Sequence, residues 1–109
     1  MIRIVGVQKH ANPDKEFVLL QNQGSMRANL RGHLLVNESA FLSGVLGDTY
    51  HPFTEDVSIG AGQYVVLYSG YGEPRWVRTK DGTVVYHCYM RREYSVWEQA
   101  LLPLHLLHI

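Results

Sequence analysis

Short runs in which apolar and polar residues alternate are separated by turn residues along most of the chain. These runs are rich in Val, Leu, Ile and Tyr, which favour β-strands, and each is shorter than an ordinary amphipathic helix. Gly, Pro, Asn and Asp interrupt the runs roughly every 8–12 residues, the spacing of all-β sandwiches and barrels. The pattern predicts strands over 2–7, 16–22, 29–37, 56–59, 63–69, 75–80 and 83–89.

Two of the connections between these strands have features of their own. The alternation weakens over 38–54, where several glycines and Pro52 predict a long connection. Asp81-Gly82 stands between two β-prone runs. It predicts a hairpin with a tight mirror-image turn, which requires positive φ.

The tail over 94–109 fits two kinds of element. Helical spacing is followed by Trp97, Leu101, Leu104 and His108. Strand spacing is followed by Leu102, Leu104 and Leu106. Because Pro103 would interrupt a helix, the sequence favours a strand.

Composition indicates one domain with a real core. The chain has 109 residues, of which 46% are hydrophobic, and its ten basic residues balance its ten acidic ones. A net charge of zero argues against binding nucleic acid or acidic lipid by bulk charge. Cys88 is the single cysteine, so no internal disulfide is possible. We find neither a signal peptide nor an apolar run of the roughly 18 residues that a membrane helix needs. We therefore expect a cytoplasmic protein without membrane contact.

Three blocks of sequence occur in an order that is known from one protein family. Glu16-Phe-Val-Leu-Leu-Gln-Asn22 follows the pattern acidic, aromatic, Val, polar, Leu, polar, Asn. Asn29-Leu-Arg-Gly-His-Leu-Leu35 is similar to Leu-x-Gly-Trp-x-Leu, with His33 in the Trp place. Ser58-Ile-Gly-Ala-Gly-Gln-Tyr-Val-Val-Leu-Tyr-Ser-Gly70 is similar to Leu-x-Pro-Gly followed by an apolar strand and Ser-Gly. With a weaker fourth block over 89–97, the chain resembles the lamin tail domain.

This resemblance implies a fold and a class of function. The lamin tail domain is an immunoglobulin-like β-sandwich of two mostly antiparallel sheets, found in nuclear lamins and in many bacterial proteins. It is viewed as an interaction module without catalytic residues. The resemblance thus implies that residues 1–109 form a single stand-alone domain of the bacterial kind. The chain lacks a coiled-coil rod, so filament assembly is not implied. It also departs from the family's usual ending at Gln99-Ala-Leu-Leu-Pro, which leaves the last strand's register open.

Leu19 and Leu34 stand where the family usually has charged or polar residues. Both positions belong to faces that are expected to meet water, and exposed leucines there would lower solubility unless something covers them. One interpretation is a patch for a protein partner or for self-association, including a homodimer. The other is that the apolar tail over 101–109 folds over them.

A second candidate site combines arginine with aromatic residues. Arg91, Arg92 and Tyr94 lie in one aromatic-rich segment, and Trp76 stands upstream between two further arginines. Tyr, Trp and Arg are typical of protein-binding hot spots. Aromatic faces with arginine also suit single-stranded nucleic acid. Because the net charge is zero and Glu93 adjoins the arginines, we expect a protein partner ahead of nucleic acid.

Metal-binding and catalytic patterns are weak. His105 and His108 are three positions apart, and His87 adjoins Cys88, but neither Cys-x-x-Cys nor His-Glu-x-x-His occurs. A metal-dependent enzyme using His87, His105 and His108 is therefore a third hypothesis. The serines lack the context of a nucleophile elbow, and the acidic pairs lack the spacing of a calcium loop. We expect no metal, no cofactor and no enzymatic activity. The leading hypothesis is a non-catalytic protein-interaction or self-assembly module, and the alternative is a nucleic-acid-binding accessory domain.

Overall fold

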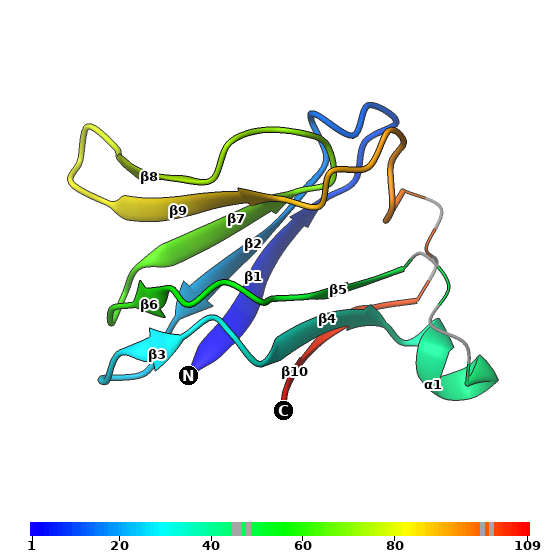
Figure 1. The fold of residues 1–109 in the computed structure, drawn as a ribbon, viewed down its shortest axis with the longest axis horizontal. Helices are drawn as coiled ribbons and strands as arrows, with labels where there is room; N and C mark the ends of the chain where they lie inside the picture. Colours follow the sequence, from blue (N-terminus) through cyan, green and yellow to red (C-terminus); the bar gives the residue numbers. More distant parts are fainter. Residues whose placement is uncertain (45–46, 48, 99, 101) are drawn as a thin grey trace.

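The computed structural model describes residues 1–44, 47, 49–98, 100 and 102–109. Strands dominate these residues, as the sequence pattern predicts (Figure 1). The elements in chain order are β1 (Ile2–Gln8), β2 (Phe17–Asn22), β3 (Ala28–Asn29), β4 (His33–Asn37), α1 (Ser39–Ser43), β5 (Tyr50–Pro52), β6 (Ser58–Ile59), β7 (Tyr64–Tyr68), β8 (Arg75–Arg78), β9 (Val84–Tyr89) and β10 (Leu104–His108).

The strands form two larger sheets and one small ribbon. Five strands pair in the order β1-β2-β7-β9-β8, and all neighbours are antiparallel except β7 and β9, which are parallel. The second sheet has the order β10-β4-β5 and is antiparallel throughout. β3 and β6 pair as a two-stranded ribbon. The architecture is therefore all-β with mixed sheets, and its short helix packs against β4.

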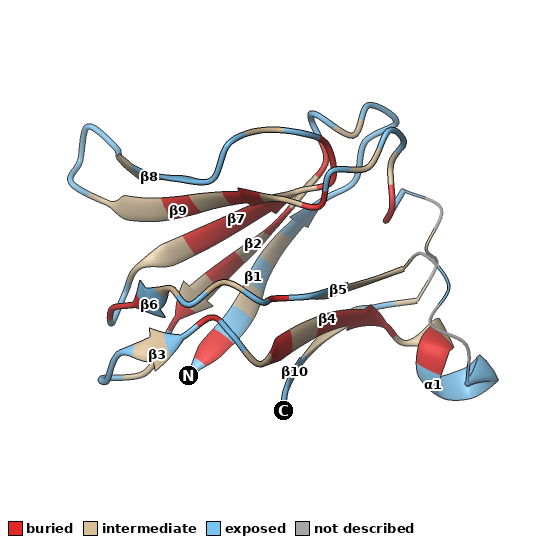
Figure 2. Ribbon diagram, viewed as in Figure 1, coloured by how far each residue is buried: buried red, intermediate tan, exposed pale blue. Residues whose placement is uncertain are grey.

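Both sheets contribute to one buried cluster. Successive side chains of a strand point to opposite faces, so alternate residues of β2 become buried. In β7 the three central residues are all buried (Figure 2). Leu35 of β4 joins this cluster, and Leu104 and Leu106 of β10 pack against it. Burial of one such leucine stabilises the fold by about 1.5–3 kcal/mol. The largest side chain in the cluster is Trp97, which is 0% exposed.

A buried carboxylate fixes the segment that carries Trp97. Glu16, which directly precedes β2, is 0% exposed. Its Oε1 accepts hydrogen bonds from the Ser69 hydroxyl (2.6 Å) and from the backbone N–H groups of Val96 (2.7 Å) and Trp97 (3.0 Å). Its Oε2 accepts from the His10 N–H (3.3 Å). One side chain thus ties β2 to the end of β7 and to the segment that follows β9.

The tail forms a strand, as the sequence favours. β10 pairs with β4 over Leu104 to His108. Gln99 and Leu101, which belong to the same tail, lie outside the described residues.

Two predicted segments are wrong. The single strand over 29–37 is divided into β3 and β4, because Gly32 has a φ of 92° and the Leu30 carbonyl accepts a hydrogen bond from His33 N–H. This turn moves the chain from the ribbon to the second sheet. The connection over 38–54 contains α1 and β5 instead of an uninterrupted loop. The Asn37 side chain accepts from Ser39 N–H, and Gly44 ends the helix with a φ of 72°.

The hairpin at Asp81-Gly82 forms, but its turn differs from the prediction. Gly82 has a φ of 88°, whereas Asp81 is not in the positive-φ region. The Thr79 carbonyl accepts from Gly82 N–H, and Thr79 N–H donates to the Thr83 carbonyl. This is the pattern of a longer loop with a glycine bulge instead of the mirror-image turn. The Asp81 carboxylate stabilises the loop by accepting from Thr83 N–H at 3.2 Å and from the Thr79 hydroxyl.

Candidate interaction surface

The outer face of the five-stranded sheet carries three rows of side chains. Strand register places Phe17, Tyr68 and Tyr89 in one row across β2, β7 and β9. The next row consists of Leu19, Val66 and His87, and the third of Gln21, Tyr64 and Val85. Apart from Gln21, all these residues are apolar, aromatic or imidazole side chains. We call the following eight residues the outer aromatic face: Phe17, Leu19, Tyr64, Val66, Tyr68, Val85, His87 and Tyr89.

Tyr68 lies at the centre of the ring contacts on this face. Its ring lies edge-on to Phe17 at 5.8 Å between centroids. It stacks on Tyr89 at 5.4 Å and on His87 at 5.8 Å. Offset or edge contacts of this kind each stabilise a pair of rings by about 0.5–1.5 kcal/mol beyond their burial. The rings therefore form one ordered surface instead of independent side chains.

Two loops border the outer aromatic face. At one end, the backbone of Gly72 lies so close to the Tyr89 ring that an added Cβ would come within 2.3 Å of it. At the other end, the β8–β9 hairpin forms a shallow cleft of about 550 Å³ with Leu19, Tyr64 and Val85. Leu19 thus lines a concave part of the surface, next to residues that are distant in sequence.

His87 gives this face a polar group that is not used internally. Its Nδ1 is buried and has no hydrogen-bond partner among the described residues. Burial, together with the nearby Arg75, holds the pKa of His87 below its usual value. The imidazole is therefore neutral at pH 7, and covering a neutral ring costs a partner far less free energy than desolvating a charged one.

Leu19 and Leu34 do not form one patch. Leu19 belongs to the five-stranded sheet, whereas Leu34 lies in the second sheet between Leu107 of β10 and Pro52 of β5. Both leucines are half-buried. The tail reaches the neighbourhood of Leu34 as an adjacent strand, and its β10 pairs with β4 and not with β2. The tail thus lies beside Leu34 and not beside Leu19, and the patch at Leu19 stays a prediction.

The arginine and aromatic residues are also divided. Arg91, Arg92 and Tyr94 follow β9, where the N–H groups of the two arginines donate to the carbonyls of Gly70 and Ser69. Trp76 lies on β8 and contacts Tyr86 of the buried cluster, with 5.2 Å between the rings. Trp76 therefore points to the core side of the sheet, opposite to the outer aromatic face. Arg92 lies near His51, and burial, with a smaller effect of Arg92, lowers the pKa of His51 to about 4.

The histidines of the metal hypothesis are separated. His87 lies on β9, His105 contacts Glu38 at 3.3 Å, and His108 stacks on His33 at 4.3 Å. Among the described residues, no three His, Cys, Asp or Glu side chains are placed to hold one metal ion. Cys88 is buried, and burial raises the pKa of its thiol well above the usual value. A buried thiol of this kind is a poor nucleophile.

Comparisons with known proteins give no family assignment. Neither the protein-family models nor the curated proteins with which the sequence was compared match it. Within the described part of the chain, every helix is too short or too polar to cross a membrane.

The sequence pattern singles out Leu19 as a candidate, which stays a prediction, and it does not indicate the rings that lie near it. Phe17, Tyr68 and Tyr89 join one row only when β2, β7 and β9 pair in the observed register. A signal was present in Tyr64-Val-Val-Leu-Tyr68, where every position is apolar or aromatic. Such a run indicates a strand whose two faces are both non-polar, in contrast to the alternation of a half-hydrated strand.

Proposed function

We propose that this protein is a non-catalytic protein-interaction module with an immunoglobulin-like sandwich fold similar to the lamin tail domain, and that it self-associates through the outer aromatic face. One observation carries the proposal. The outer positions of β7 and β9 are all apolar, aromatic or neutral imidazole, although the outer face of an antiparallel-rich sheet is ordinarily polar.

The chemistry of this face suits a protein surface as partner. Tyr supplies a large, rigid contact area together with a hydroxyl that can hydrogen-bond at the edge of an interface. Seven of the eight residues are only half-buried, and Val66 is 5% exposed because its neighbours surround it. A second copy would cover the area that is still exposed, and contiguous apolar surface of this kind marks interaction sites.

Two buried polar side chains support the family resemblance. Glu16 and Asn22 begin and end the first block of the resemblance, and both are 0% exposed. Asn22 donates to the carbonyls of Met26 and Ile59 and accepts from Gly24 N–H. Each thus has a defined structural task at the position where the family pattern has an acidic residue and an asparagine.

Sedimentation equilibrium over a range of concentrations tests the proposal. We expect a mass that rises above 12.5 kDa with concentration. Leu19→Lys should hold the protein at the monomer mass, because it places a charge in the cleft beside Tyr64 and Val85. Leu107→Lys is the matched control, since this half-exposed leucine lies on the second sheet. A monomer at every concentration, or equal effects of both variants, contradicts self-association through this face.

The same protein samples test nucleic-acid binding. Fluorescence anisotropy of labelled single- and double-stranded oligonucleotides, at low and moderate salt, reports any affinity directly. We expect no salt-dependent binding, because the net charge of the chain is zero and Glu93 adjoins the two arginines. Steeply salt-dependent binding that is lost in the double variant Arg91→Ala, Arg92→Ala would replace the proposed function with nucleic-acid binding.

A further inference from the structure

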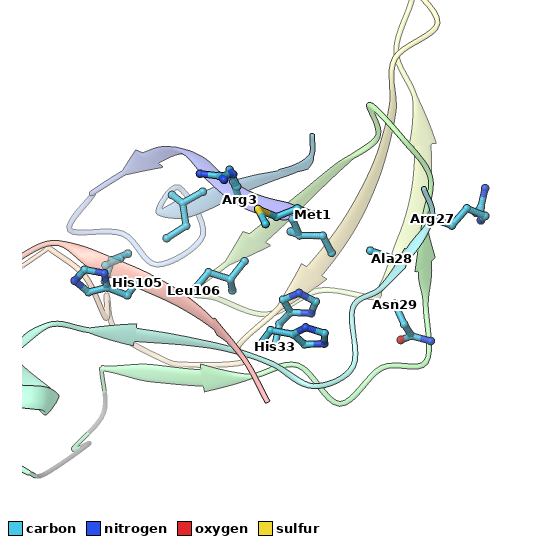
Figure 3. A pocket seen from close by; sticks show the side chains of 12 residues that line it. Met1, Arg3, Arg27, Ala28, Asn29, His33, His105 and Leu106 are labelled. Atoms are coloured by element: carbon cyan, nitrogen blue, oxygen red, sulfur yellow. The ribbon is translucent and has the colours of Figure 1, made fainter. Parts of the chain in front are cut away.

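A cleft of about 800 Å³ lies between the edge strands of the two sheets (Figure 3). β1 is an outer strand of the five-stranded sheet and β10 is an outer strand of the second sheet. The walls of the cleft are mainly apolar, with Ile2 and Ile4 on β1 and Leu104 and Leu106 on β10. The stacked imidazoles of His33 and His108 also line it. This site is separate from the outer aromatic face, because these side chains point toward the interior.

The free backbone groups of β10 face this cleft. Pro103 O accepts a hydrogen bond from Glu38 N–H, and Ile109 N–H donates to Gly32 O. In an antiparallel ladder, residues that bond to the neighbouring strand alternate with residues whose N–H and C=O groups point the other way. The register therefore directs the backbone groups of Leu104, Leu106 and His108 away from β4. All three of these residues line the cleft, together with His105.

β1 offers a shorter edge on the opposite wall. Met1 O accepts from Gln23 N–H, so by the same alternation the backbone groups of Ile2 and Ile4 point away from β2. A register shift between Ile4 and Gly6 then interrupts the regular pairing. Bulges of this kind limit the pairing of an edge strand. β10 is accordingly the better edge for pairing with an added strand, and β1 contributes apolar side chains to the cleft.

The charged side chains that line the cleft are positive. Among the described residues, the lining includes Arg3 and Arg27 but no carboxylate. Two carboxylates lie behind it: Glu38 contacts the lining His105 at 3.3 Å, and Asp56 accepts a hydrogen bond from the lining Asn29. Arg27 donates to the hydroxyl and the carbonyl of Ser58, which are neutral acceptors, so its charge is not compensated there. Figure 3 shows His33 between the strand of Arg3 and the segment of Arg27. A segment with carboxylates at its ends would therefore be attracted to this opening.

We propose that this cleft binds an extended acidic peptide of a partner protein, which adds to the second sheet as a strand beside β10. Backbone hydrogen bonds to Leu104, Leu106 and His108 hold the peptide, and its inward side chains pack against Ile2 and Ile4. A second copy of this chain is a poorer occupant, because none of the outer strands of its two larger sheets, β1, β8, β5 and β10, carries a carboxylate. Strand addition to a free edge is a recurring mode of peptide recognition.

Fluorescence polarisation with synthetic peptides tests this proposal. The probe is a fluorescein-labelled peptide of alternating valine and threonine with glutamates at both ends. One control replaces the glutamates with lysines, and a second carries N-methyl groups on alternate residues, which removes the hydrogen bonds of one edge. We expect saturable binding of the first peptide and affinities that are lower by about tenfold or more for both controls.

Protein variants locate the site. Leu106→Pro removes an N–H that points away from β4, a position where an edge strand tolerates proline, and should weaken binding about tenfold. Leu106→Val retains this N–H and an apolar side chain in the cleft, and should bind the peptide more tightly than Leu106→Pro. Amide shifts in NMR spectra should concentrate at Leu104, Leu106 and His108, and they report the site even if Leu106→Pro does not fold.

Several results would overturn the inference. These are an absence of binding, equal affinities of the acidic and basic peptides, or amide shifts that map to the outer aromatic face. Leu19→Lys should bind the acidic peptide normally. Failure of self-association therefore leaves peptide binding intact, and failure of peptide binding leaves self-association intact.

Discussion

Removal of the Glu16 carboxylate should be among the most destabilising single changes in this protein. The carboxylate accepts two backbone N–H groups, from Val96 and Trp97, which are buried in the folded state. In Glu16→Ala these donors have no acceptor, and each unsatisfied donor costs about 1–3 kcal/mol. The small cavity that remains adds to this cost. We expect a total loss of about 4 kcal/mol, a large share of the roughly 5–15 kcal/mol that stabilises a domain.

Glu16→Gln separates hydrogen bonding from charge. The amide oxygen can still accept from Val96 and Trp97, but the amide NH2 cannot accept from the N–H of His10 as Oε2 does. We expect a loss of about 1–2 kcal/mol, clearly smaller than that of the alanine variant. Glu93→Ala is the matched control, since it removes the same charge from an exposed position and should stay within about 0.5 kcal/mol of the wild type.

Equilibrium unfolding in urea, followed by the fluorescence of the buried Trp97, measures all three variants. A shift of the midpoint with an unchanged slope indicates a change in stability alone. A urea midpoint of Glu16→Ala equal to that of Glu93→Ala would refute this prediction, because the buried donors would then have found other acceptors. Equal losses for Glu16→Gln and Glu16→Ala would also refute it, since charge and not hydrogen bonding would be the cause.

Two further predictions follow from buried titratable groups. The pKa of His51 is lowered to about 4 in the folded protein, so the neutral ring stabilises the fold above pH 6.5. This stability is lost as the pH falls from about 6.5 to 4, and at pH 4.5 the loss is about 2–3 kcal/mol. Between pH 7 and 4.5, the free energy of unfolding of His51→Leu should fall by about 2–3 kcal/mol less than that of the wild type, as measured by urea titration. A pH dependence equal to that of the wild type would contradict this assignment. Because burial raises the pKa of the Cys88 thiol, iodoacetamide at pH 8 should modify Cys88 in urea but not in the native protein. Rapid alkylation of the native protein would show that the thiol is accessible.

The strand pattern is predictable from the sequence where turn residues lie between strands. The runs at β1, β2 and β7 have such boundaries, and there the prediction agrees with the structure to within one or two residues. The run over 29–37 is interrupted at Gly32, which adopts a positive φ. The local pattern of apolar residues does not indicate this interruption and predicts one continuous strand. Leu30 is 0% exposed in that turn, so its apolar character reflects burial between elements and not strand periodicity.

The candidate surface was less accessible to sequence reasoning, because it depends on pairing between distant strands. Leu19 was identifiable as an apolar residue at an expected polar position. Val66 lies beside it because β2 pairs with β7. His87 joins the same row through the parallel pairing of β7 with β9, which no local signal specifies. Leu34 attracted attention for the same reason as Leu19, yet the topology places it on the other sheet. A pattern thus indicates which residues face outward, but not which of them share a surface.

The pairing of β4 with β10 also has a consequence for how the chain folds. The Asn37 side chain donates to the carbonyl of Leu102, which lies 65 positions later. β4 leaves the ribosome well before β10, and until β10 arrives Leu35 lacks one of its two neighbouring strands. The β8–β9 hairpin is local and can form within microseconds, whereas closure of the second sheet must wait for a long-range encounter. The nascent protein therefore passes through a stage in which the edge of β4 is open to wrong partners, and refolding should be limited by the docking of its last strand.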